Sequence, residues 1–594
     1  MGFIKSILTR FFVMLGVLTF IIIVCAVIIV KSLADMKKEV ADNSVLFLNT
    51  SSIMGDVSTE SSFFYLDSFF GNKVSLVDTL IVIRKATADP KITGLFADLS
   101  EVPLSYAQVE ELRNELILFK KSGKPAYVWS DTFGEISNGT KNYYLASVFD
   151  KIYLQPSGML GLNGLSSESM FFKNMLEKLK IEPIGSHRKE YKTYWNMFSE
   201  DKYTKEHKES AESLINSIFS KIMADISDSR DIPVEKITEI SDSFTLTSAD
   251  ALKSGLVDGI KYKDEAIEEF KNFIKYEKTI SVSSYYKISH SDFEISAKSK
   301  IAVIELPGSI HRGISDMGPS GNLQSTGSIT AVSLLKKAWK DDNVKGVLIR
   351  VNSPGGSVIA SESIWNQIGI MVKENKKPVV VSMGTVAASG GYYVSMPAQK
   401  IFADHNTITG SIGVVLGKMY TREFFNWMGI TFDTVKTGKN TDLFSPLTRL
   451  EKDQSDYLEK SLDDIYNSFV TRAAENRKME VAELEKHAKG RVWTGALAKE
   501  KGLVDEIGGF MDALEYIKTK SSCEADIAIS KYPEPDKFWE MLTGSEDDSP
   551  GIIRYFENVF SFFTTFFKNI NYIQREIKVQ QQESFQLKGD VEIR

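Results

Sequence analysis

The chain repeats itself once, at an offset of about 250 residues. Four blocks recur: Lys91–Leu99 as Val344–Val351, Lys124–Trp129 as Lys377–Ser382, Tyr143-Tyr144 as Tyr392-Tyr393, and Ala251–Asp258 as Ala498–Asp505. Repetition at one spacing indicates two copies of one folding unit. In each copy, short β-rich runs alternate with helical patterns, which is typical of parallel strands joined by right-handed crossovers. The sequence therefore predicts two tandem βαβ domains of the α/β class.

We place the first domain at residues 44–275 and the second at 301–520. The stretch 276–300 is rich in Ser, Lys and Tyr and is predicted to be a connector, with some strand from Ile280 to Ile288. Residues 521–594 form a tail outside the repeat. Its aromatic run, Gly551 to Ile577, has apolar residues near helical spacing. Two interpretations stay open for this run: a helix on a membrane surface, or one docked on a neighbouring subunit.

A short flank, residues 1–10, precedes an uncharged apolar run from Phe11 to Val30. At 1.5 Å per residue, about twenty helical residues cross the ~30 Å hydrocarbon core of a bilayer. The run exceeds the ~7–15 residues of a signal-peptide core, and Lys31–Asp35 offers no small-x-small cleavage site. We therefore predict one transmembrane helix at residues 11–30. Lysine and arginine on both sides leave its orientation open.

Composition narrows the range of partners. A chain of 594 residues with 43% hydrophobic residues can bury the cores of two or more domains. The net charge of -7 and the lack of a basic stripe argue against nucleic acid as a partner. Two cysteines, Cys25 and Cys523, cannot form a disulfide framework.

The second copy carries two turns suited to acyl-transfer chemistry. The apolar strand Val347–Val351 runs into a turn that contains Gly355 and Gly356, and a helix is expected after it. The strand Pro378–Met383 leads to Ser389, which is followed by two glycines, as in turns that present a hydroxyl nucleophile. If these strands are parallel neighbours, the N–H groups of Gly355, Gly356 and Gly390 surround a developing oxyanion.

The first copy lacks both features. Val102–Ser105 stands where the second copy has its glycine pair, and Thr140, followed by Lys141-Asn142, stands where it has Ser389. The first copy is therefore predicted to be catalytically silent on its own.

Three blocks of the second copy, Ser353–Ser357, Ala388–Tyr393 and Thr409–Gly413, resemble the signature blocks of a known family. This is the signal peptide peptidase A (protease IV) family, peptidase family S49, whose members are membrane-bound serine proteases of the crotonase/Clp-protease superfold. The resemblance runs roughly from Asn43 to Lys518 and suggests the long, duplicated form. It implies a crotonase/ClpP-like fold for both domains.

A serine hydroxyl needs a partner that accepts its proton. Of six histidines only His405 lies near the motif, sixteen residues after Ser389, and a Ser-His site that uses His405 is one alternative. A lysine serves instead where a dry pocket lowers its pKa. The stretch Gly185–Thr193 resembles the family block that supplies this base, which implies Lys192.

The repeat supports this assignment, because Lys192 falls opposite Thr441 in the second copy. One copy kept the lysine and the other kept the serine. The residues after Thr193 depart from the family's pattern, so Lys189 is the fallback. Ser411 is a candidate for orienting the lysine amine, and a role in the turn is the competing interpretation.

The resemblance implies a membrane-anchored endopeptidase with a Ser389-Lys192 dyad that degrades cleaved signal peptides and similar hydrophobic peptides. It implies no cofactor or metal, a homo-oligomer, a tetramer by resemblance, and a single-pass protein of the inner membrane with its catalytic domains on the periplasmic or extracytoplasmic side. Two other classes of function stay open: a catalytically inactive membrane scaffold of the same fold, and thioester chemistry of the crotonase type, which needs no nucleophilic serine.

Overall fold

The computed structural model describes residues 39–56, 73–291, 299–316, 323–521 and 527–533. All of these except Pro533 belong to one compact unit, Met1–Ser58 with Gly71–Tyr532. The predicted transmembrane helix at residues 11–30 and the aromatic run of the tail lie outside the described residues. Among the helices that are described, none combines the length and apolarity needed to cross a bilayer.

The first half is built on a six-stranded sheet of order β8-β4-β3-β2-β1-β9 in which every neighbouring pair is parallel. Its strands are β1 (Ser44–Asn49), β2 (Ile92–Asp98), β3 (Ala126–Ser130), β4 (Lys151–Leu154), β8 (Gly259–Ile260) and β9 (Lys278–Ser281). The central strands are buried on both faces, which is the usual condition of parallel sheets.

Helices cover this sheet and extend away from it. They are η1 (Thr50–Ser52), α3 (Leu76–Ala88), α4 (Tyr106–Lys121), α5 (Thr140–Ala146), α6 (Lys173–Lys178), η2 (Thr193–Trp195), α7 (Asn196–Ser199), α8 (Lys205–Arg230), α9 (Val234–Ser241), α10 (Ser248–Lys253), α11 (Lys263–Ile274) and α12 (Val282–Ser291). Side-chain caps start several of them; Ser75, Ser105 and Thr204 each accept a backbone N–H of the first turn.

The second half repeats this arrangement in a nine-stranded sheet, with the path β11-β10-β12-β13-β14-β18 and β19 beside β10. Its strands are β10 (Lys300–His311), β11 (Thr326–Gly327), β12 (Val344–Gly356), β13 (Val379–Ala388), β14 (Lys400–Ala403), β15 (Ile408–Gly410), β17 (Val492–Thr494), β18 (Glu506–Ile507) and β19 (Ala528–Tyr532). All pairs are parallel except β15 with β17. The α/β class and the parallel pairing predicted from the sequence are confirmed.

The helices of the second half follow the same order as those of the first. They are α13 (Ser328–Lys340), α14 (Val358–Glu374), α15 (Gly390–Ser395), α16 (Arg422–Trp427), α17 (Lys452–Arg477), α18 (Val481–His487), α19 (Gly495–Glu500) and α20 (Phe510–Lys520). The predicted helix after the glycine turn is α14, and Ser357 caps it by accepting the N–H of Ala360.

Matching hydrogen bonds identify the two halves as copies. Tyr143 donates to the carbonyl of Leu256 (2.7 Å), and its counterpart Tyr392 donates to the carbonyl of Leu503 (3.0 Å). Asp258 and Asp505 likewise occupy equivalent positions of the two halves. They accept the N–H of Ile152 and of Ile401 and pair with Arg230 and Arg477, respectively. Such agreement in buried polar contacts supports a duplicated unit.

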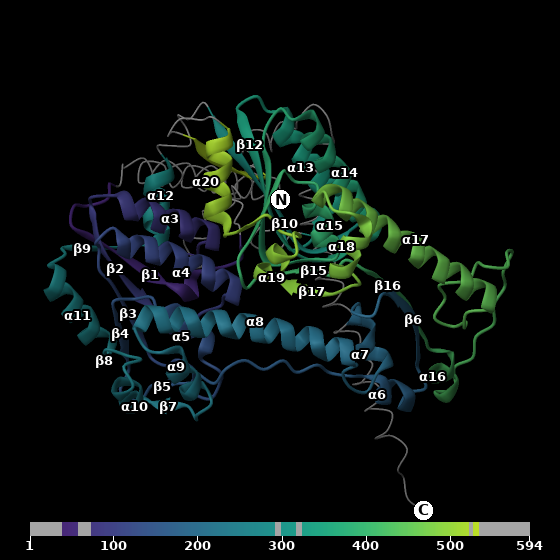
Figure 1. Cartoon of the computed structure of the whole chain (residues 1–594), viewed down its shortest axis with the longest axis horizontal. Coiled ribbons are helices and arrows are strands. Elements are labelled where there is room, and N and C mark those ends of the chain that lie inside the picture. The colour runs from purple at the N-terminus through teal and green to yellow at the C-terminus, as the bar shows by residue number, and fades with distance from the viewer. Residues whose placement is uncertain (1–38, 57–72, 292–298, 317–322, 522–526, 534–594) are drawn as a thin grey trace, which may run out of the picture. The chain divides into compact units, whose positions relative to one another are not determined.

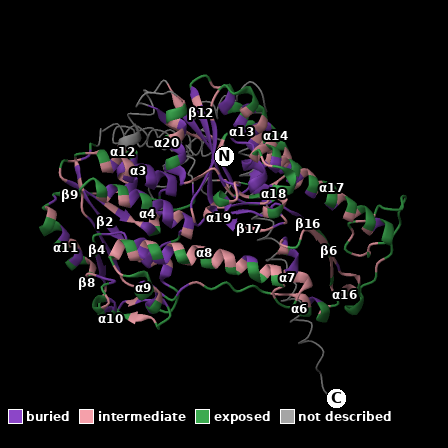
Figure 2. Cartoon of the chain, viewed as in Figure 1, coloured by how far each residue is buried: buried purple, intermediate pink, exposed green. Residues whose placement is uncertain are grey.

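The largest of three core clusters spans both halves. Apolar residues on β10, β12 and β13 of the second sheet, such as Ile301, Leu348 and Val380, join the cluster that contains α3 and α4 of the first half. Figure 2 shows the buried residues gathered in the sheets and in the helices beside them, while the outer ends of α8 and α17 carry exposed residues. Cooperative packing between the halves fixes the relative positions of groups that each half supplies.

A two-stranded antiparallel ribbon also joins the halves. It pairs β6 (Glu182–Arg188) of the first half with β16 (Val414–Tyr420) of the second, from Arg188 opposite Val414 to Glu182 opposite Tyr420. Figure 1 shows the two strands side by side, away from both large sheets. A small pair, β5 (Met159–Leu160) with β7 (Leu246–Thr247), completes the first half.

The prediction for residues 276–300 needs correction. This stretch is not only a connector, because β9 pairs with β1 at the edge of the first sheet and α12 follows it. The strand ends at Ser281, so only the start of the expected run from Ile280 to Ile288 is extended. In the same way β19, in the predicted tail, pairs with β10. Both edge strands are short, and their pairing partners lie far away in the sequence, which hides them from local patterns.

Candidate active site

Ser389 lies at the sharp turn between β13 and α15. Its backbone has φ 54° and ψ -116°, a left-handed conformation that is strained for a residue with a side chain. The strain is maintained by backbone hydrogen bonds: Ser389 N donates to Gly410 O at 2.9 Å, and Ser389 O accepts from Tyr393 N at 2.9 Å. A serine held in this way at a strand-to-helix turn points its hydroxyl out of the sheet edge.

Lys192 reaches this hydroxyl from the other half of the chain. Its Nζ atom lies 3.0 Å from Ser389 Oγ. The lysine follows strand β6 and leads into η2, and the whole residue is 6% exposed. Burial in a site without an anionic partner disfavours the charged amine and lowers the pKa of Lys192 to about 7.

Ser411 holds the amine from a second side. Lys192 Nζ donates to Ser411 O at 3.0 Å and to Ser411 Oγ at 2.9 Å. Ser411 has φ 53°, and its N–H donates to Arg491 O at 2.7 Å. The candidate orienting residue is therefore in contact with the amine through both its hydroxyl and its carbonyl.

The segment that carries the lysine is fastened to the second half. Arg188 pairs with Asp463 and Glu459, and Lys189 pairs with Glu485. Glu190 pairs with Lys489, and the N–H of Tyr191 donates to the carbonyl oxygen of Lys489. Lys189, the fallback base, is thus occupied by Glu485 and lies over the Tyr466 ring. The structure brings Lys192, and not Lys189, to Ser389.

Gly490 gives the lysine the room to lie there. It has φ 83°, and a Cβ atom at this position would be 2.5 Å from both the N and Cβ atoms of Lys192. Only glycine adopts this conformation without strain and lets the two backbones approach so closely. The sequence reading missed Gly490. No motif marks this glycine, and the first copy has Ser243 at the matching place, so the repeat does not single it out either.

The glycine turn lies against the serine turn, as parallel neighbours require. Ser353 of β12 is in register with Ala387 of β13, and a Cβ atom on Gly355 would be 2.5 Å from Gly390 N. A Cβ atom on Gly390 would be 3.1 Å from Gly356 N. The three predicted oxyanion glycines therefore converge beside Ser389. One N–H is engaged, because Gly355 N donates to Ser353 Oγ at 3.1 Å.

The matching place in the first half holds no comparable set. Thr140 Oγ1 donates to Gly164 O at 3.1 Å, and its N–H donates to Asn138 Oδ1. Ser105, where the glycine turn would be, caps α4 and contacts Thr385 of the second half at 2.7 Å. The former turn now supports the strand that leads to Ser389.

His405 is held by the first half. Its Nδ1 lies 2.6 Å from Glu110 Oε1, and the backbone N–H groups of His405 and Asn406 donate to the same carboxylate. A carboxylate that bonds three groups of one turn is a structural clamp between the halves. This arrangement does not favour His405 as the base for Ser389.

A buried ionic cluster, which was not predicted from the sequence, links the site to the first half. Arg350, on β12 just before the glycine turn, is fully buried and donates to Asp56 at 2.9 and 3.1 Å and to Glu111. It also donates to Ser382 Oγ of β13 at 2.8 Å. Arg350 thereby joins the strands of both turns to two carboxylates of the other half.

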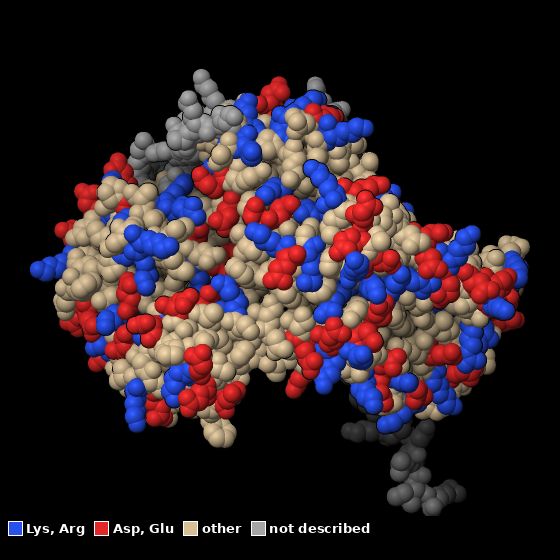
Figure 3. Space-filling model, in the orientation of Figure 1, with Lys and Arg blue, Asp and Glu red and all other residues tan. Residues whose placement is uncertain are grey.

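In the ranges of the chain that are described, no group of three or more His, Cys, Asp or Glu residues is arranged to hold a metal ion. On the face shown in Figure 3, Lys and Arg are interspersed with Asp and Glu. The chemistry available here is that of a buried amine, a strained hydroxyl and converging backbone N–H groups.

The chain is similar to several known proteins. Residues 118–276 and 371–524 match peptidase family S49. The chain is 31% identical over 485 residues to "Serine protease SPPA, chloroplastic" of Arabidopsis thaliana, covering 80% of this chain and 69% of that protein. It is 29% identical over 543 residues to "Protease 4" of Haemophilus influenzae, covering 87% and 85%. A shorter match, 35% over 198 residues, is to "Putative signal peptide peptidase SppA" of Enterococcus faecium, covering 33% and 57%.

Proposed function

Because the chain belongs to peptidase family S49 and is a serine peptidase, we propose that Ser389 is its nucleophile and Lys192 its general base. The observation that carries this proposal is the 3.0 Å separation of Lys192 Nζ and Ser389 Oγ in a buried site. Each half of the chain supplies one of the two groups, so peptide hydrolysis requires both.

The hydrogen bonds of Lys192 fit a neutral amine. A neutral amine has two N–H donors and one lone pair, whereas the ammonium form has three donors and no acceptor. Ser411 O and Ser411 Oγ take the two donors, which leaves the lone pair for the proton of Ser389. Since the pKa of Lys192 is lowered to about 7, a large fraction of the amine is neutral at physiological pH.

The proposed reaction has two stages, acylation and deacylation. Ser389 Oγ attacks the scissile carbonyl carbon while its proton moves to Lys192 Nζ; the C–N bond then breaks, and Lys192 returns the proton to the leaving amine. In the second stage of the reaction, water gives a proton to Lys192 and attacks the acyl-enzyme ester. The ester C–O bond breaks, Ser389 regains its proton, and the new carboxylic acid leaves.

Backbone N–H groups stabilise the oxyanion in both stages of the reaction. Gly356 and Gly390 are the first candidates, because a Cβ atom on Gly390 would lie 3.1 Å from Gly356 N, so the two turns are in close contact here. Gly355 joins them if its N–H leaves Ser353 Oγ when substrate binds. Donors fixed in place before the reaction are worth several kcal/mol, since a single lost donor costs about 10²–10³ in kcat.

We further propose that the substrates are cleaved signal peptides and similar hydrophobic peptides. The support is the family resemblance and the similarity to the Enterococcus faecium protein named as a putative signal peptide peptidase. The anchor at residues 11–30, a single-pass location in the inner membrane and catalytic domains on the outer side belong to the same proposal. Alkaline extraction of membranes and protease accessibility in spheroplasts test the anchor and the side.

Homo-oligomerisation, as a tetramer by resemblance, is also proposed, and the repeat supports it. Shifting β6 and β16 by the 249 residues between Tyr143 and Tyr392 gives residues 431–437 and 165–171. Both are mostly exposed, with Leu165, Phe171 and Phe432 partly buried, and neither is assigned to a strand. We propose that residues 431–437 of one copy pair with 165–171 of the next, as β6 pairs with β16 within the chain.

The register of that pairing is specific enough to test. Gly185 lies opposite Gly417, so its counterpart Thr434 would lie opposite Glu168 of the neighbouring copy. The double variant Glu168→Cys with Thr434→Cys should give disulfide-linked multimers on mild oxidation, because facing strand positions suit disulfide geometry. Either single cysteine variant is the control. A double variant that stays monomeric on a non-reducing gel rejects this pairing.

The catalytic proposal is tested by three variants in one peptidase assay. Ser389→Ala and Lys192→Met should each lower kcat/KM by at least about 10³-fold, because groups that act as a unit fail together. His405→Ala should keep most of the activity, since its ring is held by Glu110. If Lys192→Met retains near-full turnover while His405→Ala abolishes it, the histidine alternative is correct.

A further inference from the structure

Arg491 lies beside the lysine without belonging to the proposed catalytic pair. Its Nη1 is 2.6 Å from Glu209 Oε1 on α8 of the first half. Its guanidinium carbon is 4.9 Å from the centre of the Tyr191 ring and 4.3 Å from the centre of the Trp493 ring. A planar cation between two rings is a well-defined packing arrangement, and this side chain is only 17% exposed.

The backbone around Arg491 touches the site on two sides. Arg491 O accepts the N–H of Ser411, the residue that binds the lysine amine. The preceding residue, Gly490, packs directly on Lys192. Tyr191, next to Lys192 in the chain, donates its hydroxyl to the same Glu209 carboxylate at 3.0 Å. The Arg491 side chain thus fastens the lysine segment of the first half to the segment 489–491 of the second.

We infer that Arg491 is a positioning residue that keeps water away from Lys192 by clamping Tyr191 between the two halves. The inference rests on the proposed role of Lys192 as the base. Arg491 is not proposed to contact substrate. Its proposed effect is to limit the access of solvent to the Lys192 amine.

The surroundings of Lys192 explain why exclusion of water matters. Lys192 contacts Ser389, Ser411 and Gly490 of the second half, and none of these three residues is charged. The titratable groups on the neighbouring elements are engaged with one another: Arg188 with Glu459 and Asp463, Lys189 with Glu485, Glu190 with Lys489, and Arg491 and Tyr191 with Glu209. Burial alone therefore holds the pKa of Lys192 low, and added water raises it.

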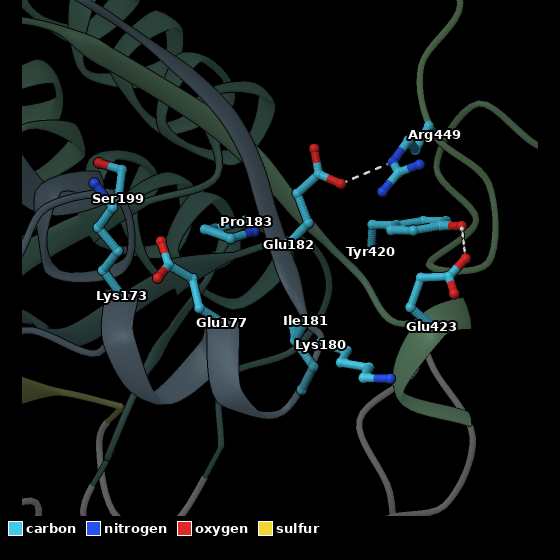
Figure 4. Close-up of a pocket in the computed structure, with 10 residues that line it drawn as sticks. All are labelled: Lys173, Glu177, Lys180, Ile181, Glu182, Pro183, Ser199, Tyr420, Glu423 and Arg449. Carbon is cyan, nitrogen blue, oxygen red and sulfur yellow. Dashed lines mark hydrogen bonds and ion pairs between the residues drawn. The ribbon is translucent and has the colours of Figure 1, made fainter. Parts of the chain in front are cut away.

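The chain offers a control in Arg449, whose side chain is 60% exposed against 17% for Arg491. This arginine also joins the halves, with Nε 2.7 Å from Glu182 and its guanidinium carbon 4.6 Å from the centre of the Tyr420 ring. Figure 4 shows Arg449, Glu182 and Tyr420 at a cavity of about 500 Å³. The pair Glu182 and Tyr420 ends the β6–β16 ribbon opposite to the end that leads to Lys192.

The test measures the pKa of Lys192 without relying on turnover. In the full-length Ser389→Ala protein, where no acyl-enzyme can form on Ser389, the rate of Lys192 acetylation by acetic anhydride is followed against pH by peptide mass spectrometry. Arg491→Ala should move this titration up by about one pH unit, and Glu209→Gln should move it in the same direction by less. Arg449→Ala should leave it near pH 7.

Kinetics give a second readout with Ser389 restored. In Arg491→Ala the acid limb of kcat/KM should move up by the same amount, so that kcat/KM falls about fivefold at pH 7 and recovers to within about twofold at pH 9.5. A loss that is equal at all pH values means a structural role only and overturns the inference. The inference is also overturned if the Lys192 titration is unchanged in both Arg491→Ala and Glu209→Gln. It is overturned as well if Arg449→Ala shifts that titration as far as Arg491→Ala does. If the titration shifts but no peptidase activity exists in any form, the proposed function fails and the clamp stands.

Discussion

Replacing Gly490 by alanine tests the close approach on which the lysine's position depends. A Cβ atom there would lie 2.5 Å from Lys192 N and Cβ, whereas ordinary contacts begin at 3.4 Å. The lysine segment must therefore retreat by about 1 Å. The same retreat lengthens the 3.0 Å separation of Lys192 Nζ and Ser389 Oγ to about 4 Å, beyond hydrogen-bond reach. A displacement of this size costs about 10²-fold in rate.

Gly429→Ala is the control for backbone strain. Gly429 has φ 82°, against 83° for Gly490, and a Cβ atom there would meet nothing within 4 Å. Both variants should lose about 1–2 kcal/mol of unfolding free energy because alanine is strained in the left-handed region, and Gly490→Ala should lose more because of its overlap with Lys192. Only Gly490→Ala should lose kcat/KM, measured on a chromogenic peptide ester and compared with urea unfolding midpoints. If Gly490→Ala stays within threefold of Gly429→Ala, the proposed geometry is refuted.

Three other predictions concern charge. The kcat/KM of the parent should rise with pH through about 7 and then level off, because the base acts as a neutral amine; a profile that is flat from pH 5 to 9 contradicts this. Asp404 is buried, has no hydrogen-bond partner for either carboxylate oxygen within the described part of the chain, and has its pKa raised well above the usual value, chiefly by desolvation. The folded state then binds the extra proton, so stability falls as pH rises from the unfolded pKa near 4 toward the folded one. Asp404→Asn should remove this fall, which amounts to about 1.4 kcal/mol of unfolding free energy for each unit by which the pKa is raised. Denaturant unfolding should therefore show a more stable variant at pH 8 and no gain in stability at pH 4. Arg350→Met should cost about 3–5 kcal/mol in the same assay, because it leaves the Asp56 and Glu111 carboxylates buried without their cation; a loss below 1 kcal/mol would contradict the buried ionic link.

The repeat made much of the fold predictable. Matching blocks and alternating strand and helix patterns are local signals, and they led to the α/β class, the parallel sheets and the two turns at Gly355 and Ser389. Strand β9 was predicted only in part and β19 was not predicted, since each is short and pairs with a strand far away in the sequence. The predicted transmembrane helix stays a prediction, as residues 11–30 are outside the described ranges.

The site was predictable only where a motif marks it. Ser389, Ser411 and the glycines sit in recognisable blocks, and Lys192 was reached through the family resemblance together with the repeat. The contacts that hold the lysine in place carry no such mark. Gly490, Arg491 and Arg350 act through residues between roughly 200 and 300 positions away, and a single sequence does not record which distant side chains meet.

The most direct test of the central claim is the rate at which a serine-reactive phosphonate modifies Ser389, followed by intact mass at pH 8. This step needs the nucleophile and its base but no peptide recognition. Lys192→Met should slow it by at least about 10²-fold, and His405→Ala should leave it unchanged within about twofold. Phosphonylation of Lys192→Met at the parent rate would contradict a site assembled from the amine of one half and the hydroxyl of the other.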